Sequence, residues 1–240
     1  MDLADAIDQI AGLGRIVTVW AHPDDESYLV GGVMSIARWL GQPVTCITAT
    51  HGDFAESEHA RRIAGHMRRA ELGVALDVLG VDDRVLLDLG DGRCQAADHH
   101  RVIDTLAAVI ADRRPDTVIT FGPDGLTGHA DHRAVSCWAT AATRLAAPAG
   151  RLLFATTTPV IHAEERDIND RFSVFEPGLP LLHDEQQLAL VLRLDTPWLD
   201  RKLAALQAHT SQTAPLIDAV GLDRYRRYVS TECLIDAAIY

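Results

Sequence analysis

The chain has 240 residues, 48% of them hydrophobic, and a formal net charge of −12 at pH 7. This length suits a single domain with a sizeable buried core. An acidic chain argues against nucleic acid or an anionic membrane as a partner, because neither would be attracted to its field. No apolar run approaches the roughly 18 residues of a membrane span. The acidic N-terminus lacks the basic region of a signal peptide, so we expect a cytoplasmic protein.

Apolar, strand-like segments alternate with helical patterns through the first two thirds of the chain. We predict strands at 15–21, 44–50, 85–87, 117–121 and 151–157. We predict helices at 27–40, 56–79, 99–112 and 132–146. Such alternation is typical of βαβ units, and it predicts an α/β fold: a Rossmann-like, doubly wound, mainly parallel sheet flanked by helices.

The alternation stops beyond about residue 158. A further strand is predicted at 187–194, with an antiparallel orientation as one option, and Pro197 opens a helix that reaches about Ala208. No segment has the composition of a linker. We therefore predict one domain over 1–240, with a core at about 15–158 and a less regular part at about 159–240 that completes a pocket.

Two local features suggest how the core packs. Gly31-Gly32 interrupts a predicted helix, which suggests close backbone packing or the approach of a ligand, because glycine inside a helix costs roughly 1 kcal/mol relative to alanine. Cys46 and Cys137 lie in apolar runs, where we expect reduced, buried thiols.

Clusters of His and Asp follow two of the predicted strands. His22-Pro23-Asp24-Asp25-Glu26 comes directly after the first strand, and Gly128-His129-Ala130-Asp131-His132 follows the strand at 117–121. In a doubly wound sheet both strand ends lie at one edge, where ligands bind. His, Asp and His ligands with an open position make a catalytic zinc site. Taken singly, each acid could instead cap a helix, and each histidine could be an ordinary hydrogen-bonded residue.

The same motifs resemble those of the PIG-L/LmbE-like family of zinc-dependent N-deacetylases, which remove acyl groups from N-acylated amino sugars and related amides. The similarity covers about residues 15 to 212. Its motifs are Ala-His-Pro-Asp-Asp-Glu at 21–26 with Gly31-Gly32, Gly-His-Ala-Asp-His at 128–132, Thr50 to Asp53, Arg68 to Leu72, Asp88 to Gly92, and Lys202 to Gln212 with His209-x-Ser211-Gln212.

The resemblance implies a role for each residue of the two main motifs. It makes His22, Asp25 and His132 the ligands of a zinc ion, and the hard Asp ligand leaves Fe²⁺, Mn²⁺ or Co²⁺ open as alternatives. Asp24 would be the general base that takes a proton from water acidified by the metal. His129 would stabilise the tetrahedral oxyanion or protonate the leaving amine. Asp131 would orient a histidine, or would only be an acid at a helix N-terminus.

Four residues are candidates for binding the substrate, each with a structural alternative. Arg68 would meet a sugar hydroxyl or a phosphate, or would pair with Glu71 one helical turn away. Asp53 would meet a hydroxyl or merely close a turn, and the family more often has Glu here. His209 and Gln212 would approach the pocket from the C-terminal part, or would be structural.

The leading hypothesis is a metal-dependent amidase acting on an N-acylated amino sugar or a similar small molecule. A thiol-conjugate amidase and a tailoring deacylase of natural products stay open within that class. A dinucleotide-binding protein is disfavoured, because no G-x-G-x-x-G follows the first strand. A catalytically silent, metal-stabilised binding module is the remaining alternative. The resemblance also suggests a homo-oligomer.

Overall fold

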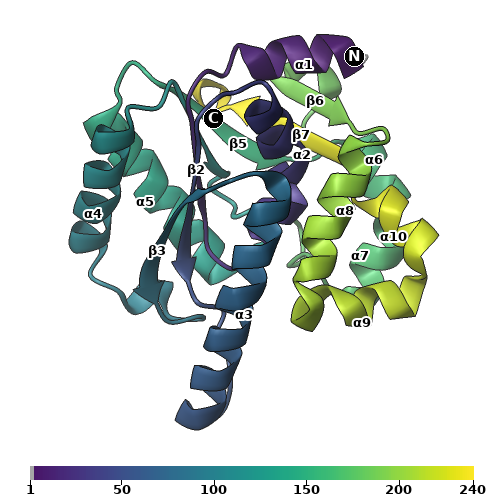
Figure 1. The fold of residues 1–240 in the computed structure, drawn as a ribbon, viewed down its shortest axis with the longest axis horizontal. Coiled ribbons are helices and arrows are strands. Elements are labelled where there is room, and N and C mark those ends of the chain that lie inside the picture. The colour runs from purple at the N-terminus through teal and green to yellow at the C-terminus, as the bar shows by residue number, and fades with distance from the viewer. Residues whose placement is uncertain (1–2) are drawn as a thin grey trace.

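A computed structural model describes residues 3–240, and its strands form one sheet in the order β3-β2-β1-β4-β5-β7-β6 (Figure 1). The strands are β1 (Ile16–Trp20), β2 (Val44–Thr50), β3 (Asp83–Leu89), β4 (Thr117–Phe121), β5 (Arg151–Thr156), β6 (Leu190–Arg193) and β7 (Thr231–Asp236). The first five strands are parallel, and β7 runs antiparallel between β5 and β6. The predicted α/β fold with a mainly parallel sheet is confirmed.

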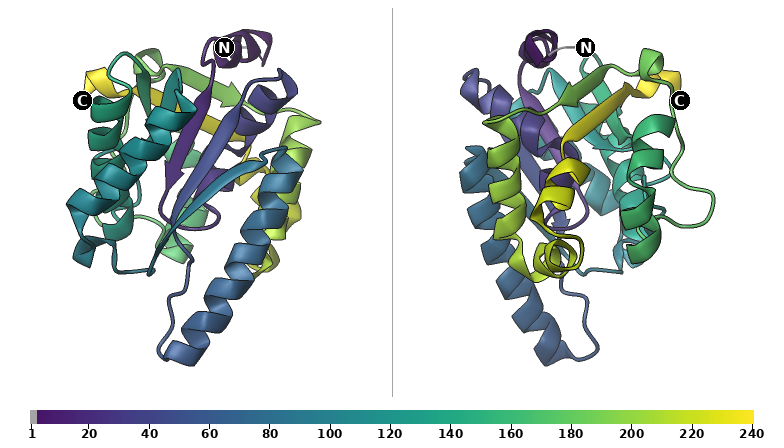
Figure 2. Two further views of the ribbon diagram at one scale, coloured as in Figure 1. Left: turned by 60° about the vertical axis from the view of Figure 1, so that its left-hand side comes forward. Right: turned by 90° about the vertical axis from the view of Figure 1, so that its right-hand side faces the viewer.

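Helices cover both faces of this sheet. They are α1 (Leu3–Ala11), α2 (Asp25–Trp39), α3 (Glu58–Leu79), α4 (His99–Arg113), α5 (Ala130–Ala146), α6 (Pro159–Glu164), α7 (Arg166–Phe172), α8 (Trp198–Ala208), α9 (Thr210–Val220) and α10 (Leu222–Tyr228). The helices α4 and α5 pack together on one face, and α2, α3 and α8 pack together on the other (Figures 1 and 2). No helix within residues 3–240 is long and apolar enough to cross a membrane.

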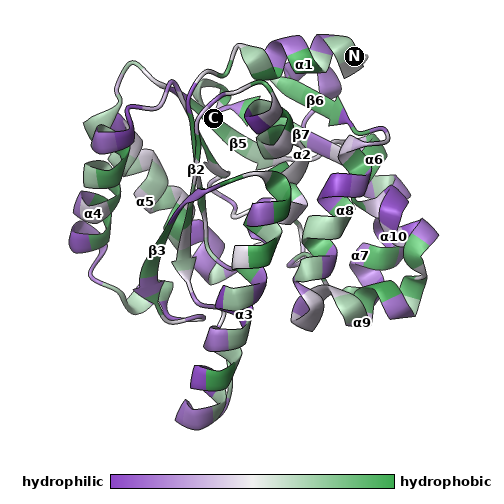
Figure 3. Ribbon diagram, in the orientation of Figure 1, coloured by the Kyte–Doolittle hydropathy of each residue, from purple (hydrophilic) through white to green (hydrophobic). Residues whose placement is uncertain are grey.

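The central strands β1, β2 and β4 are buried along their whole length. Their apolar and β-branched residues run without alternation because helices cover both sides, as expected for a parallel sheet. β2, the one of these three strands that Figure 3 labels, is coloured as hydrophobic or neutral, whereas α3 and α4 carry hydrophilic as well as hydrophobic residues. The burial of both sheet faces explains why these strands were predicted to within a residue.

The polypeptide reverses its winding direction between β1 and β4. The chain passes from β1 outward through β2 to β3, and then returns to place β4 on the other side of β1. The carboxyl ends of β1 and β4 therefore border the topological switch point, where open α/β sheets bind their ligands. The two His and Asp clusters follow these two strands.

Several elements differ from the prediction. The helix predicted at 27–40 begins at Asp25, and the strand predicted at 85–87 extends over 83–89. β7 and the helices α6, α7, α9 and α10 were not predicted. Pro215 lies inside α9, and prolines usually end helices. The prediction of a buried Cys137 was wrong, because α5 presents this residue on its outer face, while Cys46 is buried in β2.

A buried ion pair holds the kinked start of α2. The helix breaks at Val30, where φ is −145° and ψ is 20°. After the break, the Glu232 carboxylate accepts hydrogen bonds from the amides of Gly32 at 2.7 Å and Val33 at 2.9 Å. The ammonium of Lys202 lies 2.8 Å from Glu232 and donates to the Tyr28 carbonyl before the break at 2.7 Å. The pair thus binds the backbone on both sides of the kink.

Close packing explains the glycine at position 32. A Cβ atom there would lie 2.6 Å from Cδ2 of Leu194 and 3.1 Å from Oε1 of Glu232. The C-terminal part of the chain therefore packs directly against the α2 backbone. Of the two explanations offered by the sequence, close packing accounts for Gly32.

Replacing Lys202 with Met is expected to lower the free energy of unfolding by about 3–5 kcal/mol, because it leaves the fully buried Glu232 carboxylate without its cation. Denaturant unfolding followed by circular dichroism measures this change. Arg193→Met is the matched control, since Arg193 pairs with Glu185 on the surface, where loss of a pair costs about 0–1 kcal/mol. Equal losses for the two variants would contradict a special role for the buried pair.

Candidate metal centre and active site

Three predicted metal ligands meet at the switch point. His22 lies just after β1, Asp25 begins α2, and His132 lies in the first turn of α5. Nδ1 of His22 lies 3.2 Å from Nε2 of His132. The Asp25 carboxylate approaches both rings, with 3.6 Å from Oδ2 to Nδ1 of His22 and 3.5 Å from Oδ1 to Nε2 of His132. Adjacent ligands of a tetrahedral zinc ion are separated by about 3.3 Å when the metal–ligand bonds are about 2.0–2.1 Å.

Hydrogen bonds at the outer nitrogens of the two rings direct their lone pairs inward. Nδ1 of His132 lies 3.0 Å from the Gly125 carbonyl oxygen and therefore carries the proton. Nε2 of His22 faces two carboxylates, Asp91 at 3.1 Å and Asp131 at 3.3 Å, and carries the proton for the same reason. Two imidazole lone pairs and a carboxylate then face one another, an arrangement that repels itself until a cation lies between them. The donor set thus fits a divalent metal.

Asp131 is placed to orient His22. Its carboxylate is buried and accepts hydrogen bonds from the backbone amides of Gly92 at 2.7 Å and Cys94 at 3.0 Å. Burial alone would raise the pKa of Asp131, but His22 and these two amides outweigh it, so its pKa lies below the usual value. The ionised carboxylate of Asp131 holds the His22 ring in place. A carboxylate is a usual hydrogen-bond partner for the second ring nitrogen of a metal-binding histidine.

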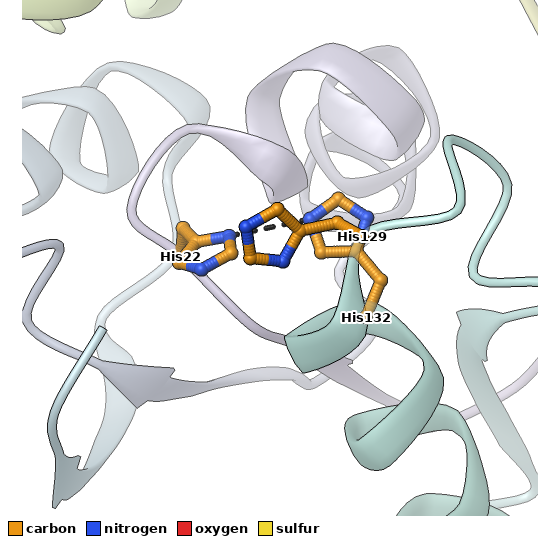
Figure 4. Close-up of side chains that lie close together, drawn as sticks. All are labelled: His22, His129 and His132. Carbon is orange, nitrogen blue, oxygen red and sulfur yellow. Dashed lines mark hydrogen bonds between the residues drawn. The ribbon is translucent and has the colours of Figure 1, made fainter. Parts of the chain in front are cut away.

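His129 stands at the open side of the centre, with its ring near both buried histidines (Figure 4). It precedes α5 and is exposed, and its Nδ1 accepts a hydrogen bond from the Asp131 amide at 3.1 Å. Its Nε2 therefore carries the proton and remains available. The potential ligand atoms of His22, His129 and His132 lie within 4.8 Å of one another, so the structure also permits His129 to act as a ligand.

Asp24 has a strained backbone beside the predicted metal ligands. Its φ of 118° and ψ of −30° are uncommon for a residue with a side chain. Such strain costs about 1–3 kcal/mol and clusters at functional sites. Two hydrogen bonds hold Asp24 in this conformation. The Asp24 amide donates to Oε2 of Glu26 at 3.0 Å, and Arg68 donates to Oδ2 of Asp24 at 3.3 Å.

The two neighbouring carboxyl groups have opposite pKa shifts. Burial raises the pKa of Asp24 to about 7, despite the opposing guanidinium of Arg68. Burial acts on Asp25 in the same direction, but His132 and His22 outweigh it and hold the pKa of Asp25 well below its usual value. Adjacent carboxyl groups with separated pKa values are typical of distinct catalytic tasks.

The structure places two of the predicted substrate-binding residues near the centre. Arg68 is buried and donates to the carbonyl oxygen of Pro23 at 2.7 Å, so it holds the backbone before Asp24. Glu71, its alternative partner, instead accepts two hydrogen bonds from Ser211. Asp53 accepts a hydrogen bond from the Asp91 amide at 2.8 Å and is half-buried. Direct contact of Arg68 and Asp53 with substrate stays a prediction.

The two C-terminal candidates differ in burial. His209 is fully buried, with Nε2 3.0 Å from Oε1 of Glu26. Burial alone would lower the pKa of His209, but the Glu26 carboxylate outweighs it and raises the pKa above its usual value. Gln212 is exposed on α9, and its amide donates to the Ser211 hydroxyl. Their contacts with substrate also stay predictions.

Sequence reasoning gave no role to two residues that the structure brings into the centre. Asp91 lies in the loop after β3, where it contacts His22 at 3.1 Å and Arg68 at 3.6 Å. Glu26 is fully buried and joins Asp24 to His209. The acidic loop at 88–92 was a signal for Asp91. Nothing local distinguished Glu26 from a helix-capping acid.

One cavity adjoins the centre, and a separate hollow lies at Asp53. A cavity of about 300 Å³ is lined by Asp25, His132 and mainly apolar residues of the C-terminal part. A more open, polar hollow of about 330 Å³ is lined by Asp53, His51, Arg93 and the start of α3. Only the first of these hollows is lined by candidate metal ligands.

A His and Asp donor set at the switch point of a doubly wound sheet, with a strained carboxylate beside it, defines a candidate metallohydrolase. Residues 17–143 match the family model described as PIG-L, GlcNAc-PI de-N-acetylase. The chain belongs to the PIG-L family, and the predicted family membership is confirmed.

Similar proteins have names that agree with the predicted class of enzyme. The chain is 29% identical over 209 residues to a probable N-acetyl-alpha-D-glucosaminyl L-malate deacetylase 2 of Bacillus cereus, covering 85% of this chain and 86% of the relative. It is 30% identical over 229 residues to a 1D-myo-inositol 2-acetamido-2-deoxy-alpha-D-glucopyranoside deacetylase of Mycobacterium sp., covering 82% and 74%. The N,N'-diacetylchitobiose deacetylase of Pyrococcus horikoshii shares the fold, with a TM-score of 0.62, 16% identity, and coverage of 98% and 87%.

Proposed function

We propose that this protein is a metal-dependent N-deacetylase that hydrolyses the amide of an N-acylated amino sugar or a similar small molecule. The observation that carries the proposal is the meeting of His22, Asp25 and His132 at the switch point beside Asp24. Membership of the PIG-L family and the names of the relatives support the substrate class. Zinc is the proposed ion, because two imidazoles, a carboxylate and an open position suit it.

Asp24, Arg68 and Asp131 each have a part in this chemistry. A bound divalent cation would supply a Lewis acid and lower the pKa of a water molecule. Asp24 accepts a proton from the attacking water, and Arg68 holds its carboxylate in place. Asp131 keeps the His22 ring in the tautomer that a ligand needs.

His129 acts on the carbonyl oxygen or on the leaving nitrogen of the amide, whereas Asp24 acts on the attacking water. Its Nε2–H donates a hydrogen bond to the developing oxyanion, or passes the proton to the leaving nitrogen. The exposed position of His129 suits a group that meets a substrate entering from solvent.

The proposal is tested by release of amine from methyl N-acetylglucosaminide. We expect the purified protein to contain about one metal ion per chain and to release acetate, leaving methyl glucosaminide with a free amine. A chelator should abolish the release, and zinc should restore it. A catalytically silent binding module would hold the metal and release no amine, and a thiol-conjugate amidase would act only when the sugar carries the thiol conjugate.

Replacing His129 with Ala is expected to lower kcat by about 10²–10³-fold while the metal stays bound, because it removes one donor to the oxyanion. Activity and metal content are measured on the same preparation. Loss of the metal would instead make His129 a ligand, which the 4.8 Å grouping with His22 and His132 permits. His100→Ala is the control, since His100 is exposed on α4.

A further inference from the structure

The cavity beside the metal ligands is larger and more apolar than an acetyl group requires. Its volume of about 300 Å³ corresponds to roughly ten water molecules at about 30 Å³ each. An acetyl group would place a single methyl there. The volume lies at the lower end of the range for small-molecule sites, roughly 300–1,000 Å³.

The cavity is contiguous with the reacting atoms. Asp25 and His132, two of the proposed ligands, line it, and so does Phe121, which stacks on the His132 ring with 4.1 Å between ring centroids. Apolar side chains from the C-terminal part form much of the remaining wall. They include Ile161, Val174, Phe175, Leu216 and Val229.

The wall also contains polar side chains, several of them engaged in hydrogen bonds, whereas the Thr157 hydroxyl is buried without a hydrogen-bond partner. The hydroxyl of Thr156 contacts His183 at 2.9 Å, and that of Thr127 contacts His132 at 3.2 Å. Burial raises the pKa of Glu165 to about 7 and that of the Cys233 thiol to about 12. Glu165 is therefore partly protonated near neutral pH. Away from Asp25 and His132, a sugar ring placed against the apolar side chains of the wall would lose hydrogen bonds to water without replacing most of them.

We propose that this cavity binds the acyl group of the substrate, and that the preferred acyl group is a medium-length alkyl chain rather than acetyl. The inference rests on the proposed function, because it says where the sugar and the acyl chain of the substrate amide lie. The acyl chain enters the apolar cavity, and the sugar lies outside it on the side of Asp53, which holds the Asp91 loop beside His22. Transfer of each methylene from water to this wall would raise kcat/KM by about fourfold until the cavity is full.

The test compares methyl glycosides of N-acetyl- and N-hexanoylglucosamine with the metal-loaded enzyme. We expect kcat/KM to be at least tenfold higher for the hexanoyl substrate. Ile161→Trp, which fills the cavity from α6, should remove this preference. Val160→Trp is the matched control, because the neighbouring Val160 is 66% exposed and outside the cavity wall, so the preference should remain. The ratio of the two kcat/KM values does not depend on the folded fraction of a variant.

The other outcomes separate the two proposals. Hydrolysis of the acetyl substrate with equal or higher kcat/KM would overturn this inference and leave the proposed function intact. Failure of both substrates to release amine would contradict the proposed function itself. A hexanoyl preference that survives in Ile161→Trp would overturn the assignment to this cavity. Octyl N-acetylglucosaminide supplies the last arm: a preference for it that Ile161→Trp removes would place the aglycone, not the acyl chain, in the cavity.

Discussion

Replacing Asp24 with Asn is expected to lower kcat by about 10²–10⁴-fold while the protein keeps its metal. The amide has the shape of the carboxylate but cannot accept the proton of the attacking water. Asn has the size and branching of Asp, so it adds no new steric conflict to the strained backbone, where φ is 118°. Arg68 can still donate to the amide oxygen, which keeps the neighbouring loop in place.

The measurement pairs steady-state kinetics with metal content and a thermal unfolding midpoint. Asp223→Asn is the control, since Asp223 lies exposed in the first turn of α10 and should leave kcat unchanged. An Asp24→Asn protein with normal turnover would remove Asp24 from the mechanism. A protein that has lost its metal would show that Asp24 supports binding rather than proton transfer.

The sequence was informative where a local pattern has one structural solution. The strands at 44–50 and 117–121 were predicted with their observed bounds, because uninterrupted apolar runs between turn residues suit a strand covered on both faces. His22 and His132 were predicted to meet because parallel strands end at one edge of the sheet. The ring nitrogens of these two residues, 110 positions apart in the chain, do meet at 3.2 Å.

Features that depend on partners distant in sequence were missed. β7 contains Glu232, and an unpaired acid is unfavourable in a buried strand. Only the structure shows that Lys202 pairs with it. Fold and pairing must be known together before such a strand can be predicted. The same is true of α9, which continues through Pro215 because neighbouring helices support it.

In the candidate site, too, local motifs were predicted and contacts between distant residues were not. The motif supplied His22, Asp24 and Asp25, which lie within four residues of one another. It could not show that Arg68 of α3 approaches Asp24 or that Asp91 approaches His22, because these residues are distant in the sequence and only the fold brings them together. The motifs thus predicted which side chains meet at the candidate centre, and tertiary packing determined what surrounds them.

Replacing His132 with Ala is expected to remove both the metal and the activity, because a donor set of three would be reduced to two. His132 also fixes the geometry of the centre, with Nδ1 held by the Gly125 carbonyl and the ring stacked on Phe121. Metal content after dialysis and amine release measure the two losses.

Asp131→Asn provides a graded comparison, because it changes the partner of a ligand and leaves the ligands themselves in place. The amide can still accept a hydrogen bond from Gly92 or Cys94, but it holds the His22 tautomer less firmly than a carboxylate does. We expect metal affinity to fall by about 10–100-fold, and saturating zinc should restore much of the activity. Zinc should restore none to His132→Ala. If the two variants respond alike to added zinc, His132 is not a ligand, and the metal centre lies elsewhere around His22, where Asp91 and Asp131 are the other close acids.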